Sequence, residues 1–198
     1  NPIDDRDSNP KKWVKYEDDE DYDNIILKSF DLALRKFIIA VSDDTKIENS
    51  EYLKNTEGTY KRAPVVDTSK LNTKDENGKI ITTATYNHTK EPVEVKKNDI
   101  VVYMLRVYNE GEIDGYAAEI KDHLPSNLEF VDGDFNKQYG WTVSEDGRTV
   151  TTKYLENAKI NKAVKNENPT TPEKTYTLSY KEVPIMCKVK DTAKDGVQ

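Results

Sequence analysis

The chain lacks the features that mark several common classes of protein. Of its 198 residues, one is a cysteine, Cys187, and two are histidines, His88 and His123. A single cysteine forms no internal disulfide, and neither histidine lies in the spacing of a metal site or a nucleophilic triad. No glycine-rich phosphate loop, GxSxG motif or HExxH motif is present. We therefore expect no enzymatic turnover.

Concentrated positive charge and long apolar segments are missing as well. The chain has 30 Lys and Arg against 37 Asp and Glu, a formal net charge of −7, and no basic run is longer than two residues. Phosphate backbones require a concentrated basic face, and a membrane-spanning helix requires about 20 consecutive apolar residues. We expect neither a nucleic-acid partner nor a membrane segment.

The composition that remains is typical of β-strands. Tyrosine is abundant, with 12 residues, and Thr, Val and Ile are plentiful. Acidic and turn-forming residues fill 1–24, which we interpret as a linker or arm. Alternating apolar residues begin at Ile25, so we place one domain at 25–198. Polar stretches at 43–57 and 156–174 are candidates for short helices within loops.

Short strands between turn signals follow one another through this domain. The clearest segment, IVVYMLRVYN at 100–109, places Val101, Tyr103, Leu105 and Val107 on one face. Further strands are expected at 79–86, 115–125, 128–131, 175–183 and 184–190, with a tight turn at Asn77-Gly78 and a hairpin around Asp146-Gly147. Cys187 falls in an alternating apolar run, which favours a buried thiol over a reactive one. The pattern predicts an all-β fold, an immunoglobulin-like antiparallel β-sandwich.

Two charged residues fall on faces that this alternation assigns to the core. Lys36 shares a face with Phe30, Leu32, Leu34, Ile38 and Ala40, and Asp122 shares one with Ala118, Ile120 and Leu124. Buried charges are rare unless they are paired, so we expect the two side chains to meet. One interpretation is a buried salt bridge. The other is an intramolecular isopeptide bond, which needs a neutral lysine amine, an Asn or Asp carbonyl held against it, and a protonated carboxyl group as acid.

Three stretches that include these residues resemble a known family. FDLALRKFI, VYMLRVYNEG and AEIKDHLP, within about residues 27–190, are similar to the surface repeats and collagen-adhesin-type isopeptide domains of Gram-positive, sortase-anchored cell-wall proteins. The resemblance implies an extracellular, structural or adhesive module on the bacterial cell surface, with neighbouring repeats as partners. It also implies that Lys36 is the bond-forming nucleophile and Asp122 the catalytic acid.

The acceptor residue does not follow the family pattern. In the resembled domains it is an asparagine on the last strand, whereas Asn157, Asn161, Asn166 and Asn168 lie in a polar stretch without strand alternation. We therefore expect the domain to lack its last strand, with the acceptor beyond Gln198 or on a partner peptide, and an open groove beside the first or the penultimate strand. The alternative is an adhesin domain that binds a host protein or glycan and holds only a Lys36–Asp122 salt bridge.

The acidic arm at 1–24 is a candidate calcium site. Hard oxygen ligands for Ca²⁺ are offered by Asp4, Asp5, Asp7, Asp18, Asp19 and Asp21. Calcium there would stiffen a junction between repeats, but the spacing is not that of an EF-hand loop, and a solvated acidic linker is the alternative. We expect Trp141 to pack in the core or at its rim, and His123, Glu119 and Lys121 to lie at the surface.

Overall fold

The computed structural model describes residues 28–42, 51–52, 59–167 and 175–194, and its fold is all-β. The strands are β1 (Leu32–Ser42), β2 (Glu51–Tyr52), β3 (Val65–Asp67), β4 (Thr85–Asn87), β5 (Ile100–Asn109), β6 (Ile120–His123), β7 (Leu128–Phe130), β8 (Thr142–Val143), β9 (Thr149–Thr152), β10 (Val164–Asn166), β11 (Thr175–Thr177) and β12 (Ser179–Val189). Helix α1 (Asp134–Gln138) has five residues, too few to cross a membrane, and the described residues contain no other α-helix.

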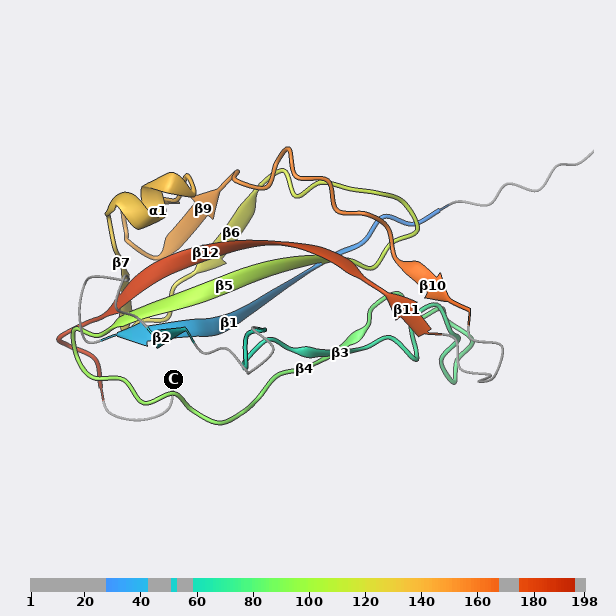
Figure 1. Cartoon of the computed structure of the whole chain (residues 1–198), viewed down its shortest axis with the longest axis horizontal. Coiled ribbons are helices and arrows are strands. Elements are labelled where there is room, and N and C mark those ends of the chain that lie inside the picture. The colour runs from blue at the N-terminus through green and yellow to red at the C-terminus, as the bar shows by residue number, and fades with distance from the viewer. Residues whose placement is uncertain (1–27, 43–50, 53–58, 168–174, 195–198) are drawn as a thin grey trace, which may run out of the picture.

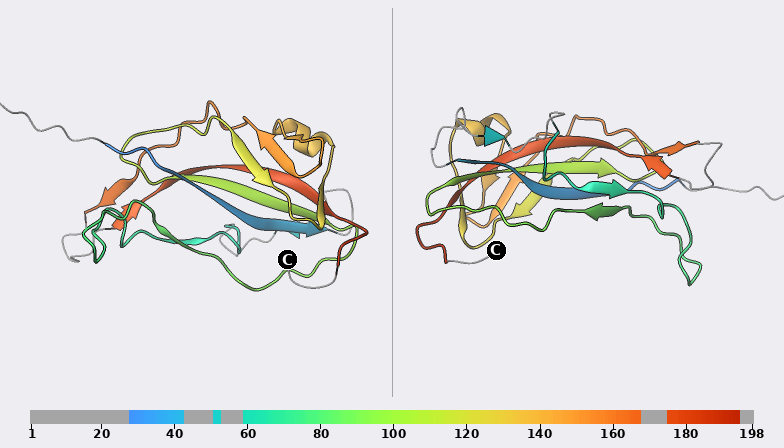
Figure 2. Two further views of the ribbon diagram at one scale, coloured as in Figure 1. Left: turned by 180° about the vertical axis from the view of Figure 1, so that it is seen from behind. Right: turned by 60° about the horizontal axis from the view of Figure 1, so that its bottom comes forward.

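Two antiparallel sheets form most of the structure (Figure 1). The large sheet has the order β2-β1-β5-β12-β7, and the small sheet has the order β6-β9-β8. The central strand β5 pairs along its whole length with β1 on one side and β12 on the other. Two further pairs, β3-β4 and β10-β11, stand apart from these sheets. Figure 2 shows that β3 and β4 lie on the side of the large sheet opposite to β6 and β9.

The two main sheets face each other across a shared apolar core. Residues from both contribute to it, namely Val101, Leu105, Val107, Ala117, Ile120, Leu124, Leu128, Trp141, Val150, Leu155, Ile160, Val183, Ile185, Cys187 and Val189. The predicted inward face of β5 is confirmed, with Tyr103 packed against this core. Trp141 is 4% exposed and Cys187 is fully buried, so both predictions of core packing are confirmed.

A second apolar core covers the outer face of the large sheet. It contains Phe37, Ile39, Ala40, Ile100, Val102, Met104 and Met186. The sequence predicted only one strongly apolar face for β1, but the structure buries the opposite face more completely, at Ala33, Phe37 and Ile39. Ala40 joins the outer core, contrary to prediction, because the register of β1 against β5 shifts between Ile38 and Ala40. Phe30 and Leu34, expected inside, are 50% and 37% exposed.

Local sequence signals explain several connections. Asp146-Gly147 turns the β8-β9 hairpin as predicted, and Gly147 has a φ of +70°, which glycine adopts without strain. The Asn77-Gly78 turn is also confirmed, with the Gly78 N–H donating to the Asp75 carbonyl at 3.0 Å. The helix expected within 43–57 lies mostly outside the described residues. Residues 156–167 form no helix and instead lead into β10, whereas α1 was not predicted.

The side chain of Asn109 holds the end of the central strand in place. It is fully buried at the end of β5. Its amide group donates to the carbonyls of Ile113 at 2.9 Å and Ile160 at 3.0 Å, and its carbonyl accepts from the Gly111 N–H at 2.9 Å. One residue therefore fastens the large sheet to the segments before β6 and before β10.

Replacing this side chain should strongly destabilise the fold. Asn109→Ala removes three hydrogen bonds and deprives the buried Gly111 N–H of its partner, and one such unpaired group costs about 1–3 kcal/mol. The cavity left by the side chain adds to this cost. We expect a loss of about 3 kcal/mol in the free energy of unfolding, measured by urea denaturation. Asn157→Ala, at an exposed position, is the matched control and should stay within about 0.5 kcal/mol of the parent protein. Equal stabilities of the two variants would contradict the assigned role of Asn109.

Candidate functional site

Lys36 and Asp122 meet between the two main sheets, as the sequence predicts. Lys36 lies in the middle of β1 opposite Leu105, and Asp122 lies in β6 opposite Val150. The Lys36 Nζ contacts the Asp122 Oδ2 directly. The two side chains are 22% and 17% exposed, so the pair is largely, but not completely, removed from solvent.

The period of two along β6 aims Asp122 at the core. Ile120 and Leu124, two positions to either side, are 4% and 1% exposed. His123 is exposed, as expected, and lies 3.1 Å from the Thr149 hydroxyl. Ala118 is an exception to the prediction: it is exposed, and Ala117 is buried in its place, because β6 begins only at Ile120. The alternation therefore holds only within the paired strand.

An aromatic ring and a thiol complete the surroundings of the pair. The Lys36 Nζ lies 4.4 Å from the centroid of the Tyr103 ring, a cation–π geometry. Burial raises the pKa of the Tyr103 hydroxyl to about 12. Burial likewise raises the pKa of the Cys187 thiol to about 12, with the charge of Lys36 acting against the shift and that of Asp122 adding to it. Both groups therefore stay protonated near neutral pH, and the carboxyl group in contact with the amine is that of Asp122.

No asparagine in the described part of the chain is hydrogen-bonded to Lys36 or Asp122. Asn166 bonds to Thr175 and Thr177 within the β10-β11 pair. Asn157 contacts only its neighbour Glu156, and Asn168 lies outside the described residues. The pair is therefore assembled without a described acceptor beside it.

The outer backbone edge of β1 around Lys36 pairs with no described strand. Beyond its pairing with β5, β1 pairs with β2 only at Ala40 and Val41. The Asp31 carbonyl accepts from the Glu110 N–H. The odd-numbered residues before the register shift therefore direct their backbone N–H and C=O groups toward β5. The N–H and C=O groups of Leu34, Lys36 and Ile38 consequently point to the opposite edge, where no described strand lies. Of these groups, the Leu34 carbonyl accepts from the Arg35 side chain, through Nη1 at 2.8 Å, in an exposed hydrogen bond. β6 is an edge strand too, since it pairs only with β9.

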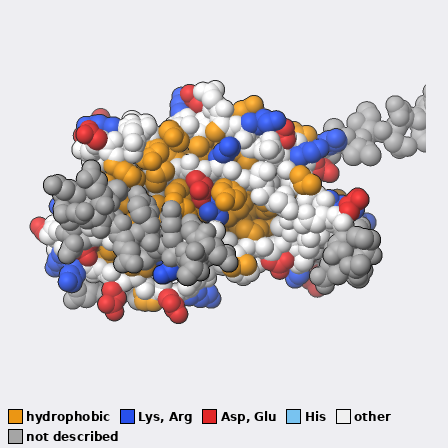
Figure 3. All heavy atoms as spheres, viewed as in Figure 1, with side chains coloured by type: hydrophobic (Ala, Val, Ile, Leu, Met, Phe, Trp, Pro, Cys, Tyr) orange, Lys and Arg blue, Asp and Glu red, His pale blue; other side chains and the backbone are white. Residues whose placement is uncertain are grey.

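A second polar cluster, on the outer face of the large sheet, was missed by sequence reasoning. The Arg106 Nε donates to Glu182 at 2.6 Å and its Nη1 donates to the Tyr108 hydroxyl at 3.0 Å, while its guanidinium lies 4.0 Å from the Tyr180 ring centroid. Figure 3 shows hydrophobic side chains gathered across the middle of one face of the molecule. Strand alternation places Arg106 and Glu182 each on the outer face of its own strand. Sequence alone does not show that they are partners, because this depends on the pairing of β5 with β12.

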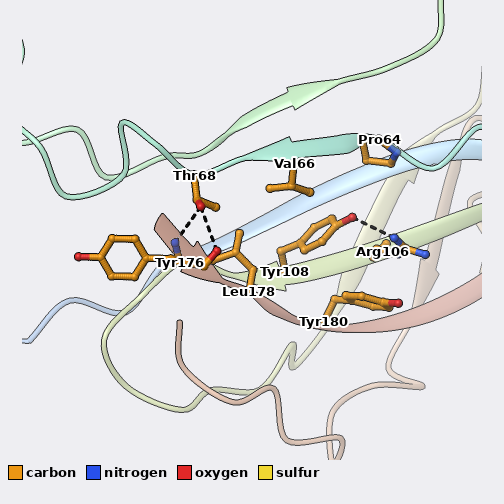
Figure 4. Close-up of a pocket in the computed structure, with 8 residues that line it drawn as sticks. All are labelled: Pro64, Val66, Thr68, Arg106, Tyr108, Tyr176, Leu178 and Tyr180. Carbon is orange, nitrogen blue, oxygen red and sulfur yellow. Dashed lines mark hydrogen bonds between the residues drawn. The ribbon is translucent and has the colours of Figure 1, made fainter. Parts of the chain in front are cut away.

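This cluster forms one wall of a cavity of about 210 Å³. Figure 4 shows Pro64, Val66 and Thr68 opposite Tyr108 and Tyr180. The Thr68 hydroxyl donates to the Tyr176 carbonyl and accepts from the Tyr176 N–H, each at 2.9 Å. Arg106, Tyr108 and Thr68 thus have hydrogen-bond partners within the protein. None of these three residues needs a ligand to complete its hydrogen bonds.

Neither a described metal centre nor a known relative identifies the Lys36–Asp122 site. The six aspartates proposed for Ca²⁺, Asp4, Asp5, Asp7, Asp18, Asp19 and Asp21, lie outside the described residues. Within the described ranges, no group of three or more His, Cys, Asp or Glu side chains is placed to hold a metal ion. Comparisons with protein-family models, with curated proteins and with solved structures found no match to this chain.

Breaking the pair from one side should cost more stability than losing an exposed charge. Lys36→Met keeps an apolar stem but leaves the Asp122 carboxylate without its partner. Because the pair is partly exposed, we expect a loss of about 2 kcal/mol in the free energy of unfolding, below the 3–5 kcal/mol of a fully buried pair. Lys121→Met is the control and should cost at most about 0.5 kcal/mol, because the Lys121 side chain is 63% exposed and its amine pairs only with the surface residue Glu119.

A second variant separates the charge effect from packing. Adding Asp122→Leu to Lys36→Met removes the unpaired charge and should recover most of the lost stability. Denaturant titration of the four proteins measures the coupling between the two sites. If the losses in the free energy of unfolding from the two single substitutions simply add, the Lys36–Asp122 contact contributes no coupling energy, which would contradict the prediction.

Proposed function

We propose that this chain is a structural or adhesive module of a bacterial cell-surface protein, and that Lys36 forms one isopeptide bond instead of turning over a substrate. The observation that carries the proposal is the contact of the Lys36 amine with the Asp122 carboxyl group between the two sheets. The two facing antiparallel sheets agree with an immunoglobulin-like sandwich of the collagen-adhesin type. Extracellular, cell-wall location and neighbouring repeats as partners rest on the resemblance of the three motifs.

The reaction balances with an asparagine as acceptor. A bond forms between the Lys36 Nζ and the side-chain carbonyl carbon of the asparagine, and the carbon–nitrogen bond of its carboxamide breaks. Two protons leave the Lys36 ammonium group: one travels through Asp122 to the departing nitrogen, which leaves as ammonia, and the other passes to solvent. Asp122 acts as the acid and base that moves these protons and also polarises the acceptor carbonyl.

The free edge of β1 is the place where an acceptor strand fits. A residue directly opposite Lys36 on an added antiparallel strand would have its Cβ about 4.5–5.5 Å from the Cβ of Lys36 and would point to the same face. An asparagine there lies beside both Lys36 and Asp122, and the fixed geometry supplies a high effective concentration. The two candidate sources of this strand are a continuation beyond Gln198 and a partner peptide, and strand addition would hold either one in place.

The alternative function is a ligand-binding adhesin domain in which Lys36 and Asp122 form only a salt bridge. The observation in its favour is the tyrosine-lined cavity between β3 and the large sheet, which would take a small part of a host protein or glycan. Calcium binding by the acidic arm is compatible with both functions and is tested independently, by Ca²⁺ titration of the full chain.

Intact-mass measurement under denaturing conditions decides between these functions. The probes are peptides of alternating valine and threonine with one asparagine, whose position is moved along the strand. We expect a covalent adduct lighter than the sum of protein and peptide by one ammonia. Lys36→Met should abolish it, Asp122→Ala should slow it by about a hundredfold or more, and the control Lys121→Met should leave it unchanged.

The remaining outcomes are equally informative. A protein that is already lighter by one ammonia without any peptide would place the acceptor within the 198 residues. Peptides with alanine in place of asparagine must give no adduct. Absence of any mass change in all samples would remove the isopeptide proposal and leave the adhesin with a salt bridge in first place.

A further inference from the structure

The large sheet has a second long strand with an outer edge, β12, and its backbone groups there can be assigned. β12 pairs with β7 only from Cys187 to Val189. The Val189 N–H donates to the Asp99 carbonyl beside β5, whereas the Lys190 N–H donates to the Asn127 carbonyl beside β7. Odd-numbered residues of β12 therefore face β5, and even-numbered residues direct their N–H and C=O groups to the outer edge.

Asn136 occupies the outer edge at Met186. The Met186 N–H donates to the Asn136 Oδ1 at 2.8 Å, and the Met186 carbonyl accepts from the Asn136 Nδ2, also at 2.8 Å. These are the two hydrogen bonds that a residue of a neighbouring strand would otherwise make. Asn136 is 1% exposed, and its Nδ2 also donates to the Val131 carbonyl, so α1 and the segment after β7 fix it in place.

The next outward-facing residue, Pro184, is closed in a different way. Proline has no N–H to offer a partner strand. Its carbonyl accepts from the indole Nε1 of Trp141 at 2.7 Å. The backbone N–H of Trp141 donates in turn to the Asn136 carbonyl at 3.1 Å, so Asn136 also helps to position the indole. Neither Pro184 nor Met186 retains a backbone group for a further strand.

We propose that Asn136, Trp141 and Pro184 form an edge lock that prevents strand pairing along β12 and confines strand addition to β1. The lock leaves Tyr180 and Glu182 as the residues of β12 with outward groups that no described residue bonds. On β1, the outward groups of Leu34, Lys36 and Ile38 pair with no described strand, and the Leu34 carbonyl accepts only from the side chain of its neighbour Arg35. That the lock directs an acceptor strand to β1 rests on the proposed function. That the lock closes β12 rests only on the contacts of Asn136, Trp141 and Pro184.

An unlocked β12 edge should pair with a second copy of the chain. Long free edges are templates for association, and proline and covering side chains are recognised defences against it. The double variant Trp141→Phe with Pro184→Val removes the indole donor and restores an N–H at position 184 while keeping apolar side chains at both positions. We expect it to dimerise with rising concentration in sedimentation velocity, while the parent protein stays monomeric.

Hydrogen exchange locates the new contact. On dimerisation, the amides of Tyr180, Glu182 and residue 184 should exchange at least about tenfold more slowly, because a ladder hydrogen bond must open first. Pro92→Val is the control, since Pro92 is exposed and lies outside the strands, in the connection between β4 and β5. If the double variant is poorly folded, Pro184→Val alone serves as the test, because it disturbs no side-chain hydrogen bond. A folded variant that remains monomeric at all concentrations would overturn the lock.

The same exchange experiment separates the lock from the proposed function. A valine–threonine strand peptide added to the parent protein should protect amides of Leu34, Lys36 and Ile38 and leave Tyr180 and Glu182 unchanged. Protection on β12 of the parent protein would refute the lock, even where a Lys36 adduct forms. Absence of any adduct would refute the isopeptide bond, while dimerisation of the double variant would still establish the lock.

Discussion

A charge that is placed between two apolar sheets needs a partner, and the Lys36–Asp122 contact meets this need for both sheets at once. Leaving either member alone would cost several kcal/mol, whereas replacing the whole pair by well-packed apolar residues is often neutral or even stabilising. Stability by itself therefore gives weak reason for a lysine at this position of β1. A chemical role gives a stronger one, because the amine is held against a carboxyl group where an acceptor can be brought in.

The surroundings of β1 depend on how thoroughly the large sheet is covered. β5 is buried on both faces, against the small sheet on one side and against the outer core on the other. Arg106, which faces outward, is consequently shielded and bonds to Glu182 and Tyr108 instead of water. Glu110 similarly accepts from the Ala84 N–H and the Tyr86 hydroxyl, and burial raises the pKa of its carboxyl group. The two contacts of Glu110 hold the segment around β4 over the outer face of the large sheet.

Sequence alternation was sufficient for the strands and faces that rely on local pattern. It placed β5 residue for residue, the β8-β9 hairpin, the buried Cys187 and the meeting of Lys36 with Asp122. It was insufficient where a residue's surroundings come from distant segments. The second buried face of β1 depends on residues near Tyr60 and Phe135, and the position of Ala40 depends on a register shift that no pattern of period two contains. The role of Asn136 could not be predicted for the same reason, because the sequence does not distinguish an asparagine that bonds to a strand edge from any other loop asparagine.

The two edges of the large sheet are unequal in a way that suits a bond made only once. β1 and β6 carry the two members of the pair, and both are edge strands on the same side of the structure, apart from the short β2. A strand added to β1 therefore lies one spacing of about 4.8 Å from Lys36. A strand added to β12 would lie three spacings away, about 14 Å, which is beyond the reach of a lysine side chain whose amine is already fixed at Asp122. An acceptor strand that paired with β12 would therefore be bound with its asparagine out of reach of the Lys36 amine. In the proposed reaction, closure of that edge by Asn136, Trp141 and Pro184 would prevent the unproductive arrangement and leave pairing at β1 as the productive one.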